Sequence, residues 1–525
     1  MGRWWRDAVV YQIYPRSFAD SDGDGVGDLA GITARLGYLA ELGVQAVWIT
    51  PFQRSPQADH GYDICDYCDV DPLFGDLPAF EEMLRAAHGQ GLRVIVDLVP
   101  NHCSHAHPLF RAALAAGPGS RERARFHFAP GRGPDGAVAP NNWTSVFGGP
   151  AWTRISELDG SPGQWYLHLY APEQPDWNWR DSRTVPFFDD VVRFWFDRGV
   201  DGLRIDVAHG LFKAEGLPDH HGTAAVQPMR LRANPLACDR EEVHQVYRHW
   251  RALADGYSPP RALIGEVNLA PARAVRYTRP DELHQAFAFA FLAAPWDARA
   301  WRSIITELLD TRVGGTSVTW VVENHDVIRA PTRYGGGVRG TARARAALLA
   351  VLGLPGAAYL YQGQELGLPE VDLPAQARQD PAWSRCGVSR DGCRVPLPWR
   401  EDEKGTYGFS VPPARSPWLP VPAGWGAYSI QAQQADPASP LHLCRAALTL
   451  RRRLHTQHVL SADDAVTIDL NSQGALEVRR GETFTLSVAM RNTPVRLPAG
   501  RLLLASGPLT SDGRLPADTA AWLRR

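Results

Sequence analysis

Eight short apolar runs with the length and composition of buried β-strands recur along the chain. They are residues 9–15, 45–51, 93–99, 202–207, 262–267, 284–292, 319–325 and 357–363. Amphipathic segments with helical periodicity lie between them, for example 28–43, 77–91 and 184–199. Strands that alternate with helices predict a parallel sheet covered by helices. Eight such units are the number that closes a (β/α)8 TIM barrel, which is the fold we predict.

A long gap and a change of pattern divide the chain around this barrel. The gap between the third and fourth runs exceeds what one helix fills, so residues 104–170 are predicted to form an inserted subdomain. After residue 455 the pattern changes to short alternating runs with turn signals, which predicts a C-terminal antiparallel β domain over 456–525. The barrel is then expected to comprise residues 1–103 and 171–455.

Charge and cysteine content exclude several classes of protein. Lys plus Arg number 55 and Asp plus Glu 57, so the net charge of -2 gives no electrostatic case for binding nucleic acid or an anionic membrane. No run approaches the ~20 apolar residues of a spanning helix, and the start of the chain has no signal-peptide pattern. The seven cysteines are an odd and scattered set, typical of free thiols in a reducing compartment. A cytoplasmic location is therefore predicted.

The carboxyl ends of four predicted strands carry residues with catalytic chemistry. The runs DLVPNH, GVDGLRIDVAH, IGEV and ENHD contribute Asp97, Asn101, His102, Arg204, Asp206, Glu266, Glu323, Asn324, His325 and Asp326. The loops at this end of a barrel build the active site. Acids and histidines without a Cys/His cluster or a Gly-rich phosphate loop favour cleavage of a glycosidic bond over metal-dependent hydrolysis or phosphoryl transfer.

These four runs, in this order, resemble the four signature regions of the α-amylase superfamily, glycoside hydrolase family 13. QPDWNW at 174–179 resembles the auxiliary region of that family. VVYQIYPRSFADSDGDGVGDLAGI, ADHGYDICDY and GCRVPLPW look most like the α-glucosidase and oligo-1,6-glucosidase branch. The resemblance spans nearly the whole chain and is specific because the motifs occur in combination.

The resemblance implies roles for three acids. Asp206 would be the nucleophile, Glu266 the general acid/base and Asp326 the third carboxylate, which binds sugar hydroxyls. We expect Arg204 to hold Asp206 ionised, and the apolar run before Glu266 to keep a proton on that acid by desolvation. Further residues implied to bind substrate are Asp59, Tyr62, His102, Arg204, His325 and Arg394, with Tyr62 as a stacking platform.

The implied reaction is that of a retaining, exo-acting α-glucosidase, which releases glucose from the non-reducing end of maltose and short malto-oligosaccharides. Double displacement predicts a carboxyl separation of roughly 5 to 5.5 Å. The partner is a small-molecule α-glucoside, and no organic cofactor is expected.

One alternative is a transglucosylase or a sucrose- or isomaltose-directed enzyme. Another is a catalytically silent binding subunit, which the presence of all three acids disfavours. Val207 resembles α-1,6-preferring members, whereas the following AHGLFK departs from their pattern.

The run DSDGDGVGD at 20–28 predicts a cation site. It spaces Asp20, Asp22, Asp24 and Asp28 with glycines, and the Val26 carbonyl would be a further oxygen donor. The twelfth position from Asp20 is Gly31 and not a bidentate Glu, so the run is not an EF-hand. It resembles the structural Ca²⁺ site that many members of this branch carry in the first βα loop. The alternative is a solvated acidic turn.

The remaining polar residues receive structural interpretations. Asp97 is expected to orient Arg204, and Asn101 is expected to brace its neighbours by hydrogen bonding. Several histidines are assigned no role, namely His105, His107, His209, His220, His221 and His284.

Overall fold

A parallel eight-stranded sheet lies at the centre of the computed structural model, which describes residues 3–221, 234–312, 316–401 and 405–525. The strand order is β11-β10-β9-β5-β2-β1-β13-β12. A parallel bridge between Phe287 and Thr319 links the two edges and brings the sheet close to a closed barrel. The strands are β1 (Val9–Ile13), β2 (Ala46–Ile49), β5 (Arg93–Leu98), β9 (Gly202–Ile205), β10 (Ala262–Gly265), β11 (Gln285–Ala286), β12 (Thr319–Val321) and β13 (Ala357–Tyr361).

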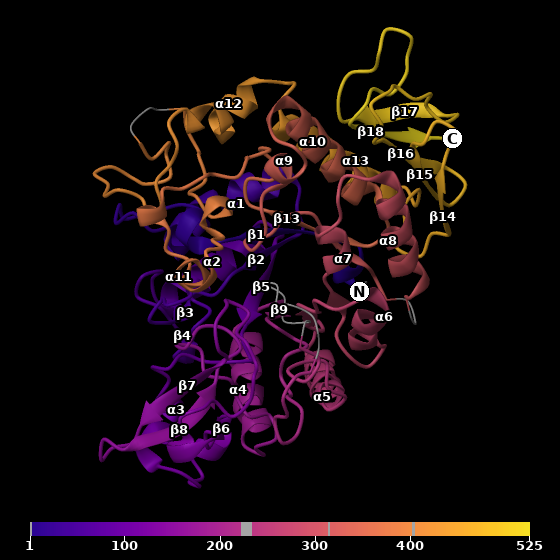
Figure 1. The fold of residues 1–525 in the computed structure, drawn as a ribbon. Coiled ribbons are helices and arrows are strands. Elements are labelled where there is room, and N and C mark those ends of the chain that lie inside the picture. The colour runs from indigo at the N-terminus through magenta and orange to yellow at the C-terminus, as the bar shows by residue number, and fades with distance from the viewer. Residues whose placement is uncertain (1–2, 222–233, 313–315, 402–404) are drawn as a thin grey trace.

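Helices cover the outside of this sheet (Figure 1). The longer ones are α1 (Leu29–Leu42), α2 (Leu77–Gly89), α4 (Thr184–Asp197), α5 (Val243–Asp255), α8 (Ala298–Asp310), α10 (Gly337–Gly353) and α13 (Pro440–Thr456). The Asp28 carboxylate caps α1 by accepting the Gly31 N–H, and Gly43 ends that helix with a φ of 100°. Short helices are α6 (Pro271–Ala274), α7 (Phe289–Leu292), α9 (Ala330–Arg333), α11 (Pro381–Cys386) and α12 (Ile430–Ala435).

The sixth predicted strand is wrong over most of its length. Only β11 is extended within 284–292, and α7 follows it. The alternation of Phe with Ala reads as a strand, but Phe287 and Phe291 are four residues apart and both are buried, a spacing that one helical turn also provides. The seventh strand is likewise shorter than predicted and ends at Val321, so the ENHD run lies in the loop beyond it.

Two smaller sheets lie at opposite ends of the molecule (Figure 1). Within 104–170, α3 (Pro108–Ala116) accompanies an antiparallel sheet of β6 (Phe128–Ala129), β8 (Pro162–Leu167) and β7 (Trp152–Ser156). The C-terminal antiparallel sheet has the order β14-β15-β16-β18-β17. Its strands are Val466–Leu470, Leu476–Arg480, Phe484–Ala489, Thr519–Arg524 and Arg501–Ala505 in that order. A two-stranded ribbon, β3 (Gln53–Arg54) and β4 (Asp66–Val70), follows β2.

The C-terminal sheet packs against the barrel through a buried aromatic side chain. Trp522 of β18 is fully buried, and its indole N–H donates to the Leu349 carbonyl of α10 at 3.0 Å. Gly353 lies against the same indole, where an added Cβ would approach Nε1 to 2.7 Å. Among the described residues, no helix is both long and apolar enough to cross a membrane.

Candidate active site

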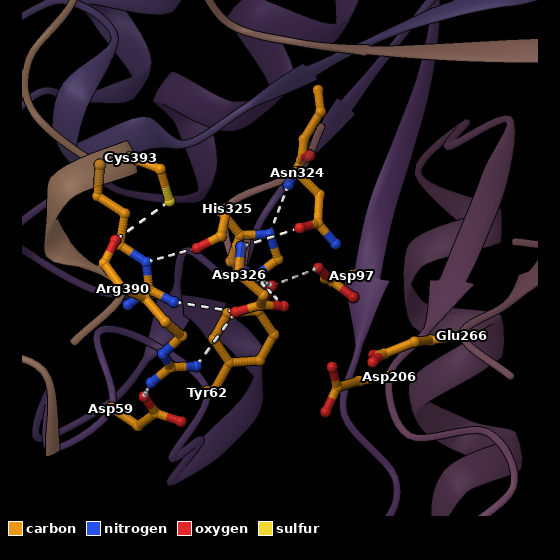
Figure 2. Close-up of polar contacts among 12 residues, drawn as sticks. Asp59, Tyr62, Asp97, Asp206, Glu266, Asn324, His325, Asp326, Arg390 and Cys393 are labelled. Carbon is orange, nitrogen blue, oxygen red and sulfur yellow. Dashed lines mark hydrogen bonds and ion pairs between the residues drawn. The ribbon is translucent and has the colours of Figure 1, made fainter. Parts of the chain in front are cut away.

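One buried guanidinium joins the ends of three neighbouring strands. Arg204 of β9 is 1% exposed, and its NH1 donates to Asp97 Oδ1 at 2.8 Å and to Asp206 Oδ1 at 2.7 Å. Its NH2 contacts Glu266 Oε2. Because β5, β9 and β10 are adjacent and parallel, their carboxyl ends bring these acids to one edge. Figure 2 shows the Asp206 and Glu266 side chains there, with both carboxyl groups directed toward Tyr62 and Asp326.

The ionisation of Asp206 differs from the expectation. Burial and then the Glu266 carboxyl raise the pKa of Asp206 well above its usual value, and Arg204 offsets this only in part. Arg204 is shared among three carboxylates, so its charge stabilises no single one of them fully. A neighbouring carboxylate raises the pKa of a carboxyl group because two like charges close together repel each other. Arg204 lowers the pKa of Asp206, as predicted from the sequence, but burial and the Glu266 carboxyl outweigh this effect.

Asp326 faces this pair and is held by different partners (Figure 2). Its Oδ1 accepts from Arg390 NH1 at 3.2 Å and from Arg394 NH2 at 3.1 Å, and its Oδ2 lies 3.4 Å from His325 Nε2. Burial opposes ionisation, but His325, Arg390 and Arg394 outweigh it and lower the pKa of Asp326 well below its usual value. Asp326 is therefore a fixed negative charge on the wall opposite Glu266.

His325 has a defined tautomer and stacks on an aromatic ring. The Gln12 amide N–H₂ donates to its Nδ1 at 2.7 Å, so the ring proton lies on Nε2, facing the Tyr62 hydroxyl and Asp326. The Tyr62 ring stacks on it with centroids 5.4 Å apart and an interplanar angle of 3°. Burial lowers the pKa of His325 to about 3, so the ring is neutral at pH 7.

A second buried network positions His102. Asn101 contacts the Nδ1 atom of His102 at 3.1 Å and donates to Asp176 Oδ2 at 3.2 Å. Lys213 is fully buried; its Nζ lies 2.8 Å from both Asp176 Oδ2 and Asn101 Oδ1 and also donates to the Gly210 carbonyl. The network therefore joins the loops that follow β5 and β9 to the QPDWNW segment.

These side chains surround a cavity of about 500 Å³. Of the residues predicted from sequence, those that line it are Asp59, Tyr62, His102, Asp206, Glu266, His325 and Asp326. Arg204 lies beneath the cavity and contacts its acids. Arg394 lies behind Asp326 and donates to the His325 carbonyl at 2.8 Å, so the structure does not place it on the cavity wall.

Sequence reasoning missed the arginine that does line the cavity. Arg390 NH2 donates to Asp59 Oδ1 at 2.8 Å, while Gln174 donates to Asp59 Oδ2 at 3.1 Å. The run SRDGCR contains both Arg390 and Arg394, and only the fold distinguishes which one faces the cavity. His209, which was assigned no role, also lies on the wall. Val207 and Asn324, which the sequence motifs contain, also line the cavity, and the lining residues that were not predicted are Val146, Phe147, Tyr170, Asn268, Phe289, Ala290, Leu292, Ala293 and Val327.

Three of the predicted cation ligands converge. Ligand atoms of Asp20, Asp22 and Asp28 lie within 4.8 Å of one another, and Asp24 is not part of this group. Burial, together with the Asp22, Asp20 and Asp28 carboxylates, raises the pKa of Asp24, as expected where negative charges converge. Asp20 also accepts the Gly23 and Gly25 N–H groups at 2.7 and 3.0 Å. The donor set fits a hard cation with oxygen ligands.

Comparison with known proteins gives consistent matches. A family model described as the alpha amylase catalytic domain matches residues 12–459. The chain is 38% identical over 470 residues to a Rhizobium meliloti (strain 1021) protein named "Probable alpha-glucosidase", covering 86% of this chain and 82% of the relative. It is 32% identical to an "Oligo-1,6-glucosidase" of Parageobacillus thermoglucosidasius, covering 86% and 84% of the two chains.

The solved structure of an alpha-glucosyl transfer enzyme, XgtA, has the same overall fold. The two structures superpose with a TM-score of 0.90 at 35% sequence identity, and the match covers 100% of both chains.

The buried Lys213 network predicts a stability effect. Replacing Lys213 with Met leaves the buried Asp176 carboxylate without its cation, which is expected to lower the free energy of unfolding by about 3–5 kcal/mol. Chemical denaturation of the purified protein measures this loss. The double variant Lys213→Met/Asp176→Asn is expected to recover most of it, because no lone buried charge remains. A single variant within about 1 kcal/mol of the original protein would contradict the network's assigned role.

Proposed function

The chain belongs to the α-amylase family of hydrolases, and we propose that it is a retaining, exo-acting α-glucosidase. Its substrates would be maltose and short malto-oligosaccharides, from whose non-reducing end it releases glucose. One observation carries the proposal: Asp206 and Glu266 share one guanidinium, while Asp59, Arg390 and Asp326 form the wall opposite them. The catalytic pair therefore faces a polar end wall across one cavity.

The proposed reaction has two displacement steps. Asp206 attacks the anomeric carbon and forms a glucosyl ester while Glu266 donates a proton to the leaving oxygen. Glu266 then removes a proton from water, which attacks the anomeric carbon, releases glucose and regenerates the Asp206 carboxylate. The interaction of both carboxyl groups with the two terminal nitrogens of Arg204 favours the short separation of a retaining enzyme.

The end wall supports exo action. Arg390 joins Asp59 to Asp326, and its guanidinium carbon lies 4.8 Å from the centroid of the Phe147 ring. Charge-assisted hydrogen bonds from such groups would bind the hydroxyls of a terminal glucose. A chain continuing beyond that glucose would have to displace these buried ion pairs. We therefore propose that this wall limits cleavage to the terminal residue.

His102 and His325 would contribute to binding the same glucose. Burial lowers the pKa of His102 to about 4, so both rings are neutral at pH 7 and serve as hydrogen-bonding groups without charge. Tyr62, held by its stack on His325, would provide the aromatic surface for the sugar ring.

Transglucosylation is the alternative, and the similarity to the alpha-glucosyl transfer enzyme favours testing it. The same glucosyl ester would then pass to a sugar hydroxyl in place of water. Product analysis at high maltose or sucrose concentration separates the two reactions. Free glucose as the main product supports hydrolysis, whereas disaccharide isomers or longer oligomers support transfer.

We also propose that the loop 20–28 binds a structural Ca²⁺ through Asp20, Asp22 and Asp28. These acids converge, and neighbouring backbone fixes the loop because Arg415 N–H donates to the Gly23 carbonyl at 2.8 Å. Asp24 and the Val26 carbonyl were predicted as further ligands and stay part of the proposal. The ion would stabilise the first βα loop and take no part in the reaction.

The proposed function is tested by stereochemistry and chain-end dependence. Proton NMR of p-nitrophenyl α-glucoside hydrolysis, which releases a single glucose, is expected to show α-glucose as the first product, and Asp206→Asn is expected to lower kcat by about 10⁴-fold or more. A malto-oligosaccharide blocked at its non-reducing end should resist cleavage, while its unblocked counterpart is cleaved. Maltose, isomaltose, sucrose and trehalose compared side by side establish the linkage preference. β-Glucose as first product, or cleavage of the blocked chain at a similar rate, would contradict the proposal.

The calcium proposal predicts a ligand-dependent melting temperature. Removing Ca²⁺ with EDTA is expected to lower Tm, since a ligand at 100 times its Kd stabilises the folded state by about 2.7 kcal/mol. Asp22→Asn should reduce this difference, whereas Asp159→Asn, a matched exposed carboxylate in the 104–170 segment, should leave it unchanged. Equal Tm values in Ca²⁺ and EDTA would show that the loop is a solvated acidic turn.

A further inference from the structure

Arg390 is held from behind by a carboxylate outside the cavity. Asp380 is buried and does not line the wall, yet its Oδ2 accepts from Arg390 Nε at 2.8 Å and its Oδ1 from Arg390 NH2 at 2.9 Å. Its Oδ2 also accepts the Arg390 backbone N–H at 2.6 Å. A two-point contact with a guanidinium sets the plane of that group as well as its position.

This contact determines which groups Arg390 can reach. With Nε and NH2 bound to Asp380, the guanidinium directs NH1 to Asp326 and shares NH2 with Asp59. Arg390 has five N–H donors on a rigid plane, so rotation of that plane would break the contacts to Asp59 and Asp326 together. Through the Arg390 side chain, Asp380 therefore determines whether Asp59 and Asp326 keep their hydrogen bonds to the guanidinium.

Asp380 is itself fixed by a helix that packs on the 104–170 segment. It caps α11 by accepting the Ala382 N–H at 3.0 Å, and its own N–H donates to Asp391. From the same helix, Arg385 donates to the carbonyls of Gly148 and Pro150 at 3.0 and 3.2 Å. Ala382 packs in one apolar cluster with Phe147, over which Arg390 lies. The position of Arg390 thus depends on how α11 sits against this segment.

We propose that Asp380 is a positioning residue that orients Arg390 and so sets how tightly the end wall binds a terminal glucose. The inference rests on the proposed glucosidase function and adds to it a residue that touches no substrate. Its removal should weaken ground-state binding of the terminal glucose, while Asp206 and Glu266, which Asp380 does not contact, keep their own partners. KM should therefore change more than kcat.

Asp380→Asn tests this, since Asn retains an oxygen that can cap α11. We expect KM for p-nitrophenyl α-glucoside to rise about tenfold, as loss of one charge-assisted contact predicts, with a smaller fall in kcat. Asp380→Ser keeps a helix cap and removes both guanidinium contacts, so it should raise KM at least as far. Asp372→Asn is the matched control, because that carboxylate is 97% exposed in the same region and should leave KM unchanged. Melting temperatures establish that each variant is folded.

A double-mutant cycle separates positioning from a general structural role. If Asp380 acts through Arg390, adding Asp380→Asn to Arg390→Gln should change KM by less than twofold. Unchanged KM in both Asp380 variants, or a full additional rise in the Arg390→Gln background, would overturn the inference. Failure of the original protein to hydrolyse any α-glucoside would instead overturn the proposed function, so the two failures are distinguishable.

Discussion

The contact of Arg204 with three carboxylates is the interaction on which the site depends. One buried cation faces Asp97, Asp206 and Glu266, which come from three adjacent strands. A buried carboxylate without a cation would be costly, so Arg204 is what allows three acids to occupy one strand end. Because Arg204 is shared among three carboxylates, it offsets only part of the rise in the pKa of Asp206 that burial and Glu266 cause. The same contacts fix where the acids lie and help to set the pKa of Asp206.

Arg390 repeats this arrangement across the cavity with a different result. It also contacts three carboxylates, Asp59, Asp326 and Asp380, but Arg394 adds a second cation beside Asp326. Asp326 therefore stays ionised while the pKa of Asp206 is raised. The cavity thus has Asp206, whose pKa is raised, on one wall and Asp326, whose pKa is lowered, on the other. This arrangement suits a reaction in which a proton is transferred on one side of a sugar while a carboxylate on the other side binds its hydroxyls.

The barrel and the central acids could be predicted because strand runs and signature motifs are local in sequence. What sequence could not provide was any effect that depends on residues distant along the chain. The pKa of Asp206 is raised in part by Glu266, sixty positions away, whereas only the nearby Arg204 was apparent. The choice between Arg390 and Arg394 depends on which faces the cavity, which the motif does not encode. The prediction of a sixth strand over 284–292 was wrong over most of its length because the spacing of its Phe residues fits a helical turn as well as a strand.

The most direct test of this account is the pH dependence of glucosyl transfer to Asp206, using α-glucosyl fluoride, whose leaving group needs little protonation. Protonated Asp206 cannot attack, so kcat/KM should fall as pH drops through its raised pKa. Glu266→Gln removes the neighbouring carboxyl that helps raise this pKa. The acidic limb should therefore move to lower pH in that variant. An acidic limb at the same pH in both proteins would contradict the claim that the Glu266 carboxyl raises the pKa of Asp206.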